Sequence, residues 1–148
     1  MNTDTQPVQI LLVEDNDTDV MIAREALRFS TVANELHVVE DGEEAIKYLR
    51  RQPPYERAAR PDLVLLDLNL PKKGGREVLA EVKTDPTLLQ IPIVILSTSK
   101  ADEDVYAAYS LHANSYVAKP LDFAAFGHIL LTLEQFWLCM VILPKARP

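Results

Sequence analysis

The chain alternates five times between a short apolar run and a longer segment with helical spacing. The apolar runs are rich in Val, Ile and Leu, and they cover residues 8–13, 36–39, 63–66, 91–96 and 116–118. Such runs are typical of strands that are buried on both faces of a parallel sheet. The segments with helical spacing cover residues 17–29, 43–50, 76–83, 103–111 and 122–137. The pattern predicts a three-layer α/β domain, with a parallel sheet of five strands between two layers of helices.

The length of the chain, 148 residues, predicts one domain of this kind and no second folded domain. We expect a disordered N-terminal leader over residues 1–7, the α/β domain over residues 8–137, and an apolar C-terminal extension without an output domain over residues 138–148. Asn16 stands directly before the first helical segment, and we expect it to be the N-cap of that helix.

The charge balance argues against several classes of partner. Fifteen basic and 22 acidic residues give a formal net charge of −7, which disfavours binding to nucleic acid or to an anionic membrane. The single cysteine excludes an internal disulfide framework, and the first residues do not resemble a signal peptide. The longest apolar run, residues 136–143, is much shorter than the roughly 20 residues of a membrane-spanning helix. We therefore expect a cytoplasmic protein that does not cross a membrane.

Polar residues stand at the ends of four predicted strands, where apolar residues would stabilise the core better. Glu14 and Asp15 follow the first strand, and Asp67 follows the third. Ser97 follows the fourth strand, and Lys119 follows the fifth. The carboxyl ends of parallel strands lie at one edge of the sheet, where such folds bind their ligands. The sequence therefore predicts one acidic site at this edge.

Clustered carboxylates repel one another, and a divalent cation relieves that repulsion. A ligand set of oxygens, without Cys or His nearby, favours Mg²⁺ over zinc, with Mn²⁺ as a second candidate. When such an ion neutralises Glu14, Asp15 and Asp67, Asp67 can act as an in-line nucleophile on a phosphoryl group. Lys119 and the Ser97 hydroxyl can then bind the phosphoryl oxygens.

A further candidate metal ligand lies two residues after Asp67. It is the backbone carbonyl of Asn69, in a turn that Pro71 and Gly75 shape. Spacing alone supports this ligand less strongly than the acids.

Four segments at these strand ends resemble the motifs of CheY-like receiver domains. They are Leu12-Val13-Glu14-Asp15-Asn16, Leu65-Leu66-Asp67-Leu68-Asn69-Leu70-Pro71, Ile95-Leu96-Ser97 and Tyr116-Val117-Ala118-Lys119-Pro120, in a match over about residues 7–137. The resemblance implies a flavodoxin-like, doubly wound (βα)5 fold. It also implies a response regulator of a two-component system or phosphorelay, which a histidine kinase phosphorylates.

The resemblance assigns roles that agree with those argued from the residues. It implies that Asp67 is the phosphoacceptor and that Glu14 and Asp15 are the metal-binding acids. It further implies that Asn69 supplies a carbonyl ligand and that Ser97 is the switch hydroxyl. Lys119 matches the lysine of the family motif.

A narrower resemblance is to the small phytochrome-associated response regulators. It rests on Asn69-Leu70-Pro71-Lys72-Lys73, Ser97-Thr98-Ser99-Lys100, Leu111-His112-Ala113-Asn114-Ser115-Tyr116 and Phe136-Trp137-Leu138. It implies a phytochrome histidine kinase as phosphodonor and a homodimeric regulator. One departure is Gly74, which stands where the family commonly has an acid. We expect this change to loosen the loop after Asp67 and to leave the chemistry intact.

Phosphorylation of Asp67 adds about −1.5 to −2 charges and three acceptor oxygens. We expect Ser97 to move inward and to donate a hydrogen bond to these oxygens. We further expect Tyr116 to turn from an outward to an inward rotamer, into the space that Ser97 leaves. This change alters the surface around the fourth helix and the fifth strand.

Other functions fit the residues less well. A Mg²⁺-dependent phosphohydrolase also uses an Asp nucleophile, but the position of its second acid is occupied by Asn69 here. A flavodoxin-like electron carrier needs a phosphate-binding loop after the first strand, and this chain has acids there. A receiver domain with an inactive site is disfavoured by the intact acids, Ser97 and Lys119. We expect no enzymatic activity beyond self-phosphorylation and slow autodephosphorylation.

The last helical segment carries an apolar stripe that is wider than one buried face. A monomer would expose more apolar surface than solubility usually permits, so the stripe favours a homodimer or effector interface. The expected interface residues are Phe126, Leu133, Phe136, Trp137 and Met140. The alternative is that this part of the chain folds back on its own domain.

Overall fold

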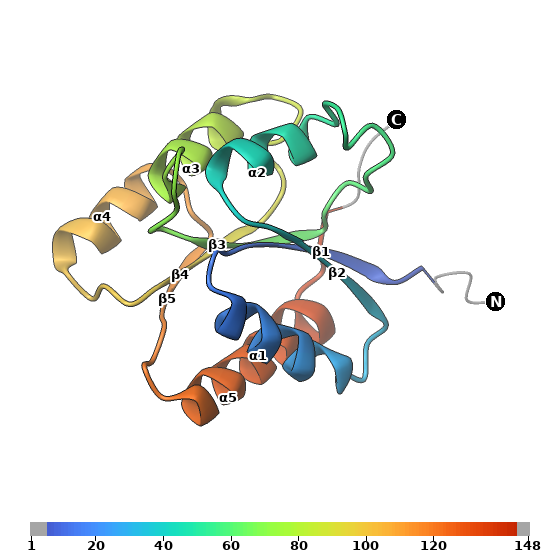
Figure 1. Cartoon of the computed structure of the whole chain (residues 1–148), viewed down its shortest axis with the longest axis vertical. Helices are drawn as coiled ribbons and strands as arrows, with labels where there is room; N and C mark the ends of the chain where they lie inside the picture. The colour runs from blue at the N-terminus through green and yellow to red at the C-terminus, as the bar shows by residue number, and fades with distance from the viewer. Residues whose placement is uncertain (1–5, 145–148) are drawn as a thin grey trace.

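The computed structural model describes residues 6–144, so residues 1–5 of the expected leader and residues 145–148 of the expected extension lie outside the described residues. Strands and helices alternate along the described chain as the hydrophobic pattern predicts (Figure 1). The elements are β1 (Val8–Val13), α1 (Asp17–Arg28), β2 (Asn34–Val39), α2 (Gly42–Leu49), β3 (Leu63–Asp67), α3 (Gly75–Thr84), β4 (Ile93–Ser97), α4 (Asp102–Ser110), β5 (Ser115–Ala118), α5 (Phe123–Glu134) and a π-helix, η1 (Gln135–Met140).

The five strands form one parallel sheet in the order β2-β1-β3-β4-β5. Helices α1 and α5 cover one face of the sheet, and α2, α3 and α4 cover the other (Figure 1). The predicted fold, a flavodoxin-like (βα)5 domain, is therefore confirmed. The strand order reverses between β1 and β3, and a crevice for ligands forms at such a point in doubly wound sheets.

Successive side chains of each strand enter two separate hydrophobic clusters, because they point to opposite faces of the sheet. In β1, Leu11 and Val13 pack under α2 and α3, whereas Ile10 and Leu12 pack under α1 and α5. Strands β3 and β4 are buried along their whole length. The buried strands hold the residues that follow them in fixed positions at the sheet edge.

Three strands begin at residues other than those predicted; β5 begins one residue early, at Ser115, and the other two have local reasons. Strand β4 begins at Ile93 and not at Ile91, because the Ile91 N–H closes a turn on Leu88 and Pro92 has no N–H to donate. Strand β2 begins at Asn34, two residues earlier than predicted, and there it pairs with Val8 at the start of β1.

The last helix is longer than predicted and ends in a wider turn. Helix α5 continues into η1, where the Val141 N–H donates to the Phe136 carbonyl at i→i+5 spacing. The resulting helix, Phe123–Met140, is long and apolar enough to cross a membrane by length and composition, which the prediction from the longest apolar run had missed. One face of this helix packs along α1 and buries Leu130 against the sheet, and 22% of the segment is buried.

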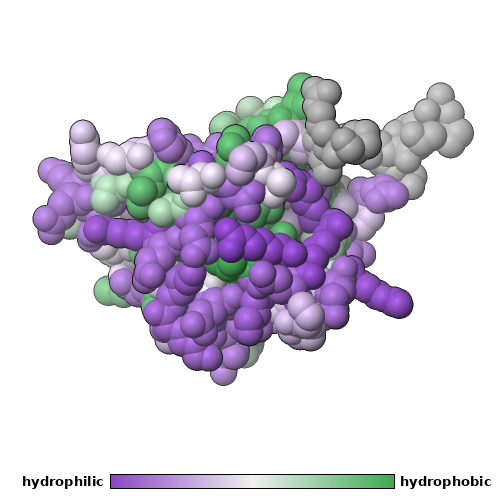
Figure 2. Space-filling model, turned by 90° about the horizontal axis from the view of Figure 1, so that it is seen from above, coloured by the Kyte–Doolittle hydropathy of each residue, from purple (hydrophilic) through white to green (hydrophobic). Residues whose placement is uncertain are grey.

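The face of the molecule above α2 and α3 is mostly hydrophilic, with apolar residues only in small groups (Figure 2). Lys73, in the loop before α3, forms an ion pair with Glu81 of α3. Most apolar residues of α2 and α3 are buried in the hydrophobic cluster on this side of the sheet.

The N-terminus of α3 lies unusually close to the end of β3. A Cβ atom at Gly75 would lie 2.4 Å from the Asp67 carbonyl oxygen and 2.6 Å from the Leu68 Cα. The Gly75 N–H also donates to the Leu68 carbonyl at 3.0 Å. By contrast, the nearest atom to a Cβ at Gly74 would be 3.9 Å away. Only glycine therefore fits at position 75, whereas position 74 has room for a side chain.

We expect Gly75→Ala to lower the free energy of unfolding by about 1–3 kcal/mol, because its methyl group overlaps the backbone after β3. Gly74→Ala is the matched control, and we expect it to change that free energy by less than about 0.5 kcal/mol. Urea denaturation followed by circular dichroism measures both. Equal effects of the two substitutions would show that the close approach at Gly75 does not affect the free energy of unfolding.

Candidate functional site

The predicted acids come together at the carboxyl edge of the sheet. Strands β1 and β3 are neighbours in register, with Val13 opposite Leu66, so the next residues, Glu14 and Asp67, lie side by side. Carboxylate oxygens of Glu14, Asp15 and Asp67 all lie within 4.8 Å of one another. Glu14 and Asp67 are buried, whereas Asp15 is exposed. The predicted acidic site is therefore present, with one side open to solvent.

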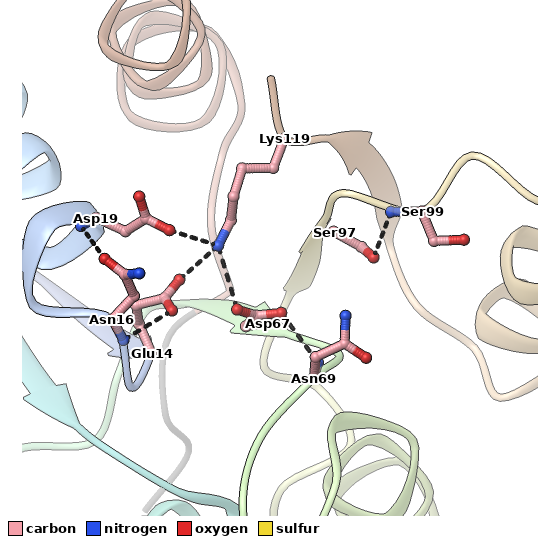
Figure 3. A network of polar contacts seen from close by, with 8 residues as sticks. All are labelled: Glu14, Asn16, Asp19, Asp67, Asn69, Ser97, Ser99 and Lys119. Atoms are coloured by element: carbon pink, nitrogen blue, oxygen red, sulfur yellow. Dashed lines mark hydrogen bonds and ion pairs between the residues drawn. The ribbon is translucent and has the colours of Figure 1, made fainter. Parts of the chain in front are cut away.

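Lys119 reaches into this site from the end of β5. Its ammonium Nζ lies 2.7 Å from Glu14 Oε1 and 3.2 Å from Asp67 Oδ2 (Figure 3). The same ammonium lies 5.6 Å from the centroid of the Phe126 ring, a cation–π contact from α5. The side chain of Lys119 is 7% exposed, so these contacts are shielded from water.

Asp19 is a third acid at this ammonium, and the sequence pattern did not single it out. Its Oδ2 lies 2.9 Å from Lys119 Nζ (Figure 3). Asp19 stands in the first turn of α1, whose N-cap is Asn16 as predicted, since the Asn16 side chain accepts the Asp19 N–H at 2.9 Å. A signal for this contact was its spacing: Asp19 lies in the first helical turn after an acidic strand end.

Burial and pairing act in opposite directions on the two central groups. Burial is the largest cause of a rise in the pKa of Glu14 to about 7, a rise that remains although the hydrogen bond from Lys119 lowers this pKa. Burial by itself would lower the pKa of Lys119, but its hydrogen bonds to Glu14 and Asp19 outweigh burial and raise that pKa above its usual value. The lysine therefore stays charged, while Glu14 takes up protons more easily than an exposed glutamate.

Asp67 is held from two sides. Its Oδ1 accepts the Asn69 N–H at 3.0 Å, and its Oδ2 accepts Lys119 (Figure 3). The first contact closes a short turn after β3 and fixes the direction of the carboxylate. The role of the Asn69 carbonyl as a metal ligand stays a prediction.

Ser97 is fully buried at the end of β4, the neighbour of β3. Its hydroxyl oxygen accepts the Ser99 N–H at 3.1 Å. A cleft of about 420 Å³ opens beside it and is lined in part by Asn69, Gly75 and Arg76. Ser97 therefore lies next to Asp67 in the sheet, with open space on the loop side.

Tyr116 is connected to Ser97 through the main chain of Ser99, a residue to which the sequence assigned no role of its own. The Tyr116 hydroxyl donates to the Ser99 carbonyl at 2.9 Å. The Tyr116 ring is half-buried and packs against the cluster under α4, where the Tyr109 hydroxyl accepts the Tyr116 N–H at 3.1 Å. The two predicted switch residues thus both make hydrogen bonds with Ser99, in the loop after β4. The turn of Tyr116 between rotamers stays a prediction.

The structure corrects the predicted interface. Phe126 and Trp137 are 3% and 9% exposed and pack, with half-buried Leu133, in the core under α1 and α5. They lie on the inner face of the last helix, so the sheet of the same chain covers them. Phe136 and Met140 are 48% and 74% exposed, and they remain available to a partner.

Comparison with known proteins supports the same assignment. Residues 10–130 match the response regulator receiver domain family. Response regulator Rcp1 of Synechocystis sp. is 47% identical over 140 residues, which cover 95% of this chain and 95% of that protein. The probable methanogenesis regulatory protein FilR2 of Methanothrix harundinacea is 40% identical over 132 residues, which cover 89% of this chain and 84% of that protein.

Two solved structures are similar over nearly the whole chain. The phosphorylated cyanobacterial phytochrome response regulator RcpA is 50% identical with a TM-score of 0.92, and the match covers 95% of this chain and 100% of that one. The Mn²⁺-bound form of Rcp1 is 47% identical with a TM-score of 0.91, and the match covers 94% and 100%. The resemblance to phytochrome-associated response regulators is thereby confirmed, and a phosphohydrolase is not favoured.

The sheet order, the acids around Lys119 and these matches lead to one conclusion: the chain belongs to the response regulator receiver domains of two-component systems.

Proposed function

We propose that this chain is a phosphorylation switch in which Asp67 accepts a phosphoryl group from a phosphohistidine of a sensor histidine kinase. The observation that carries the proposal is the position of Asp67. It lies at the end of a buried strand, within 4.8 Å of two further acids and 3.2 Å from the Lys119 ammonium. Glu14 makes the same two kinds of contact, with Lys119 and with the Asn16 N–H. Asp67 differs in its place on β3, between the strand that leads to Glu14 and the strand that ends at Ser97.

In the transfer step, a carboxylate oxygen of Asp67 attacks phosphorus while the P–N bond to the donor imidazole breaks. The bonding electrons leave with the imidazole nitrogen, and the product is an acyl phosphate on Asp67. The Asn69 N–H and Lys119 orient the attacking carboxylate. Lys119 also opposes the negative charge that arrives with the phosphoryl group.

The acidic residues fit a hard divalent cation. Glu14, Asp15 and Asp67 offer carboxylate oxygens close together, and the exposed side at Asp15 leaves room for water and phosphoryl ligands. Mg²⁺ is the proposed ion, with Mn²⁺ as a substitute, and the Asn69 carbonyl is the proposed additional ligand. When bound, the ion neutralises the acids and draws charge from the phosphoryl oxygens.

The proposed donor is a phytochrome histidine kinase, because RcpA is by name a phytochrome response regulator. The net charge of −7 disfavours binding to nucleic acid or to an anionic membrane. We propose that the chain signals through protein contacts in the cytoplasm. We further propose that the chain catalyses no reaction beyond its own phosphorylation and slow dephosphorylation.

We expect one phosphoryl group on the wild-type chain after treatment with acetyl phosphate and Mg²⁺, and none on Asp67→Asn, because the amide is not a nucleophile here. Intact-protein mass spectrometry measures the adduct, and removal of Mg²⁺ with EDTA should abolish it. Asp102→Asn, at an exposed acid in α4, is the control and should be modified like the wild type. An adduct on Asp67→Asn of equal size would refute the assignment.

The proposed switch uses Ser97, Ser99 and Tyr116. The Ser97 hydroxyl uses its oxygen to accept from Ser99, so its hydrogen is free to donate to a phosphoryl group on Asp67. Movement of Ser97 shifts the Ser99 main chain, which holds the Tyr116 hydroxyl. Tyr116 then changes its rotamer, and the surface around α4 and β5 changes with it.

We expect Ser97→Ala to accept the phosphoryl group but to lose the accompanying change at Tyr116, because alanine cannot donate a hydrogen bond. NMR of the Tyr ring signals, before and after phosphorylation, measures this change. Ser110→Ala removes an exposed hydroxyl from α4 and should respond like the wild type. A normal Tyr116 response in Ser97→Ala would contradict the proposed coupling.

We propose that the chain forms a homodimer through the exposed part of its C-terminal helix. Phe136 and Met140 project from η1, and Ile142 follows with 96% exposure. Burial of such side chains against a second copy stabilises a dimer through the hydrophobic effect.

Accordingly, the double substitution Phe136→Ser and Met140→Ser should raise the dimer dissociation constant at least about tenfold, since each buried apolar side chain contributes roughly 1.5–3 kcal/mol. Sedimentation over a series of concentrations, with and without phosphorylation, measures the constant. Leu89→Ser, at a partly exposed leucine before β4, should leave it unchanged. A wild-type chain that stays monomeric throughout would overturn the dimer.

A further inference from the structure

Resting on the proposed function, we propose that Asp19 is a positioning residue: it anchors the Lys119 ammonium in the site when Glu14 and Asp67 serve other ligands. A lysine ammonium has three N–H donors. Here, three carboxylates from three elements accept them, at 2.7 Å from Glu14, 2.9 Å from Asp19 and 3.2 Å from Asp67. The donors of Lys119 are therefore fully used.

The three carboxylates differ in what else they can do. Oxygens of Glu14 and Asp67 belong to the acidic group that could hold a metal ion, whereas Asp19 is not part of that group. A carboxylate oxygen of Asp67 also forms the bond to phosphorus in the acyl phosphate. Metal binding and phosphorylation thus compete with Lys119 for two of its three acceptors, and Asp19 is the acceptor that stays free of both.

Lys119 needs such an anchor because a divalent cation in the acidic group repels its ammonium. Two cations close together in a poorly hydrated site destabilise each other, and an acid that contacts only one of them offsets that repulsion. Without Asp19, the Lys119 ammonium would lower its electrostatic energy by moving away from the cation toward solvent. A displaced Lys119 could not bind the phosphoryl oxygens.

Asp19 is well placed for this role. Its main-chain N–H is fixed by the N-cap, Asn16, so its backbone position follows directly from the end of β1. Its side chain is 18% exposed, compared with 2% for Glu14 and 9% for Asp67. Partial contact with water makes the desolvation cost of the Asp19 carboxylate smaller than that of a fully buried carboxylate.

A purely structural role for Asp19 is its charge in the first turn of α1, which stabilises the helix N-terminus. Asp17 shares this role, since it lies in the same turn, but it is exposed and makes no hydrogen bond or ion pair with a side chain in residues 6–144. Asp17→Asn is therefore the matched control: it removes the same charge from the same turn and leaves the Lys119 contact intact.

The first test uses ¹⁵N NMR of the Lys119 ammonium in the full chain, without metal and at saturating Mg²⁺, with Lys119→Met to assign the signal. We expect Asp19→Asn to speed exchange of these protons with water at least about tenfold at saturating Mg²⁺, since it removes a charge-assisted hydrogen bond. Asp17→Asn should exchange like the wild type. Equal exchange rates of the Lys119 protons in the two variants would refute the proposal that Asp19 anchors Lys119, whatever the phosphorylation assay shows.

The second test measures the rate of phosphorylation by acetyl phosphate at saturating Mg²⁺. We expect Asp19→Asn to be about tenfold slower than Asp17→Asn, and this difference to vanish in the Lys119→Met background. A difference that persists without Lys119 would show that Asp19 acts by another route and would overturn the proposal. A wild-type chain that accepts no phosphoryl group would refute the proposed function, while the exchange test still decides whether Asp19 anchors Lys119.

Discussion

Crowding of negative charge at the ends of β1 and β3 is the constraint on which the site depends. Four acids, Glu14, Asp15, Asp19 and Asp67, surround or adjoin one ammonium, and two of them are buried. One lysine cannot balance four carboxylates. The site therefore responds strongly to any cation that enters and to any anion that is added, which is the property a charge-operated switch requires.

The fold keeps these repelling groups together because it fixes the backbone on which they stand. Leu11 and Val13 lock β1 to one helical layer, while Ile10 and Leu12 lock it to the other. The register between β1 and β3 then leaves Glu14 no position away from Asp67. The free energy gained by burying the two cores is much larger than the repulsion at one sheet edge. The packing of the cores therefore fixes the positions of the acids, despite their repulsion.

The strand ends could be predicted because parallel strands bring their carboxyl ends to one edge, whichever strands are neighbours. Glu14, Asp67, Ser97 and Lys119 were found in this way. Asp19 was missed because the side of a helix that faces a site depends on how the helix tilts against the sheet. Hydrophobic periodicity does not contain that angle.

The two corrected residues of the C-terminal helix show a second limit. A stripe that contains Phe126 and Trp137 shows that one face of the helix is apolar. It does not show whether the same chain or a second copy covers that face. Here the sheet and α1 cover the stripe. The wider turn of η1 was equally invisible in the sequence, because π-helical turns have no strong residue preference of the kind that marks an N-cap.

The hydrogen bond from the Tyr116 hydroxyl to the Ser99 carbonyl lies between the buried site and the surface of α4 and β5. Coupling between two places in a protein is reciprocal in free energy. A macromolecule that docks on α4 and prefers one rotamer of this tyrosine must therefore shift the equilibrium between free and modified aspartate by the same amount. If the proposed coupling through Tyr116 operates, the concentration of such a partner would help to set the fraction of Asp67 that carries a phosphoryl group.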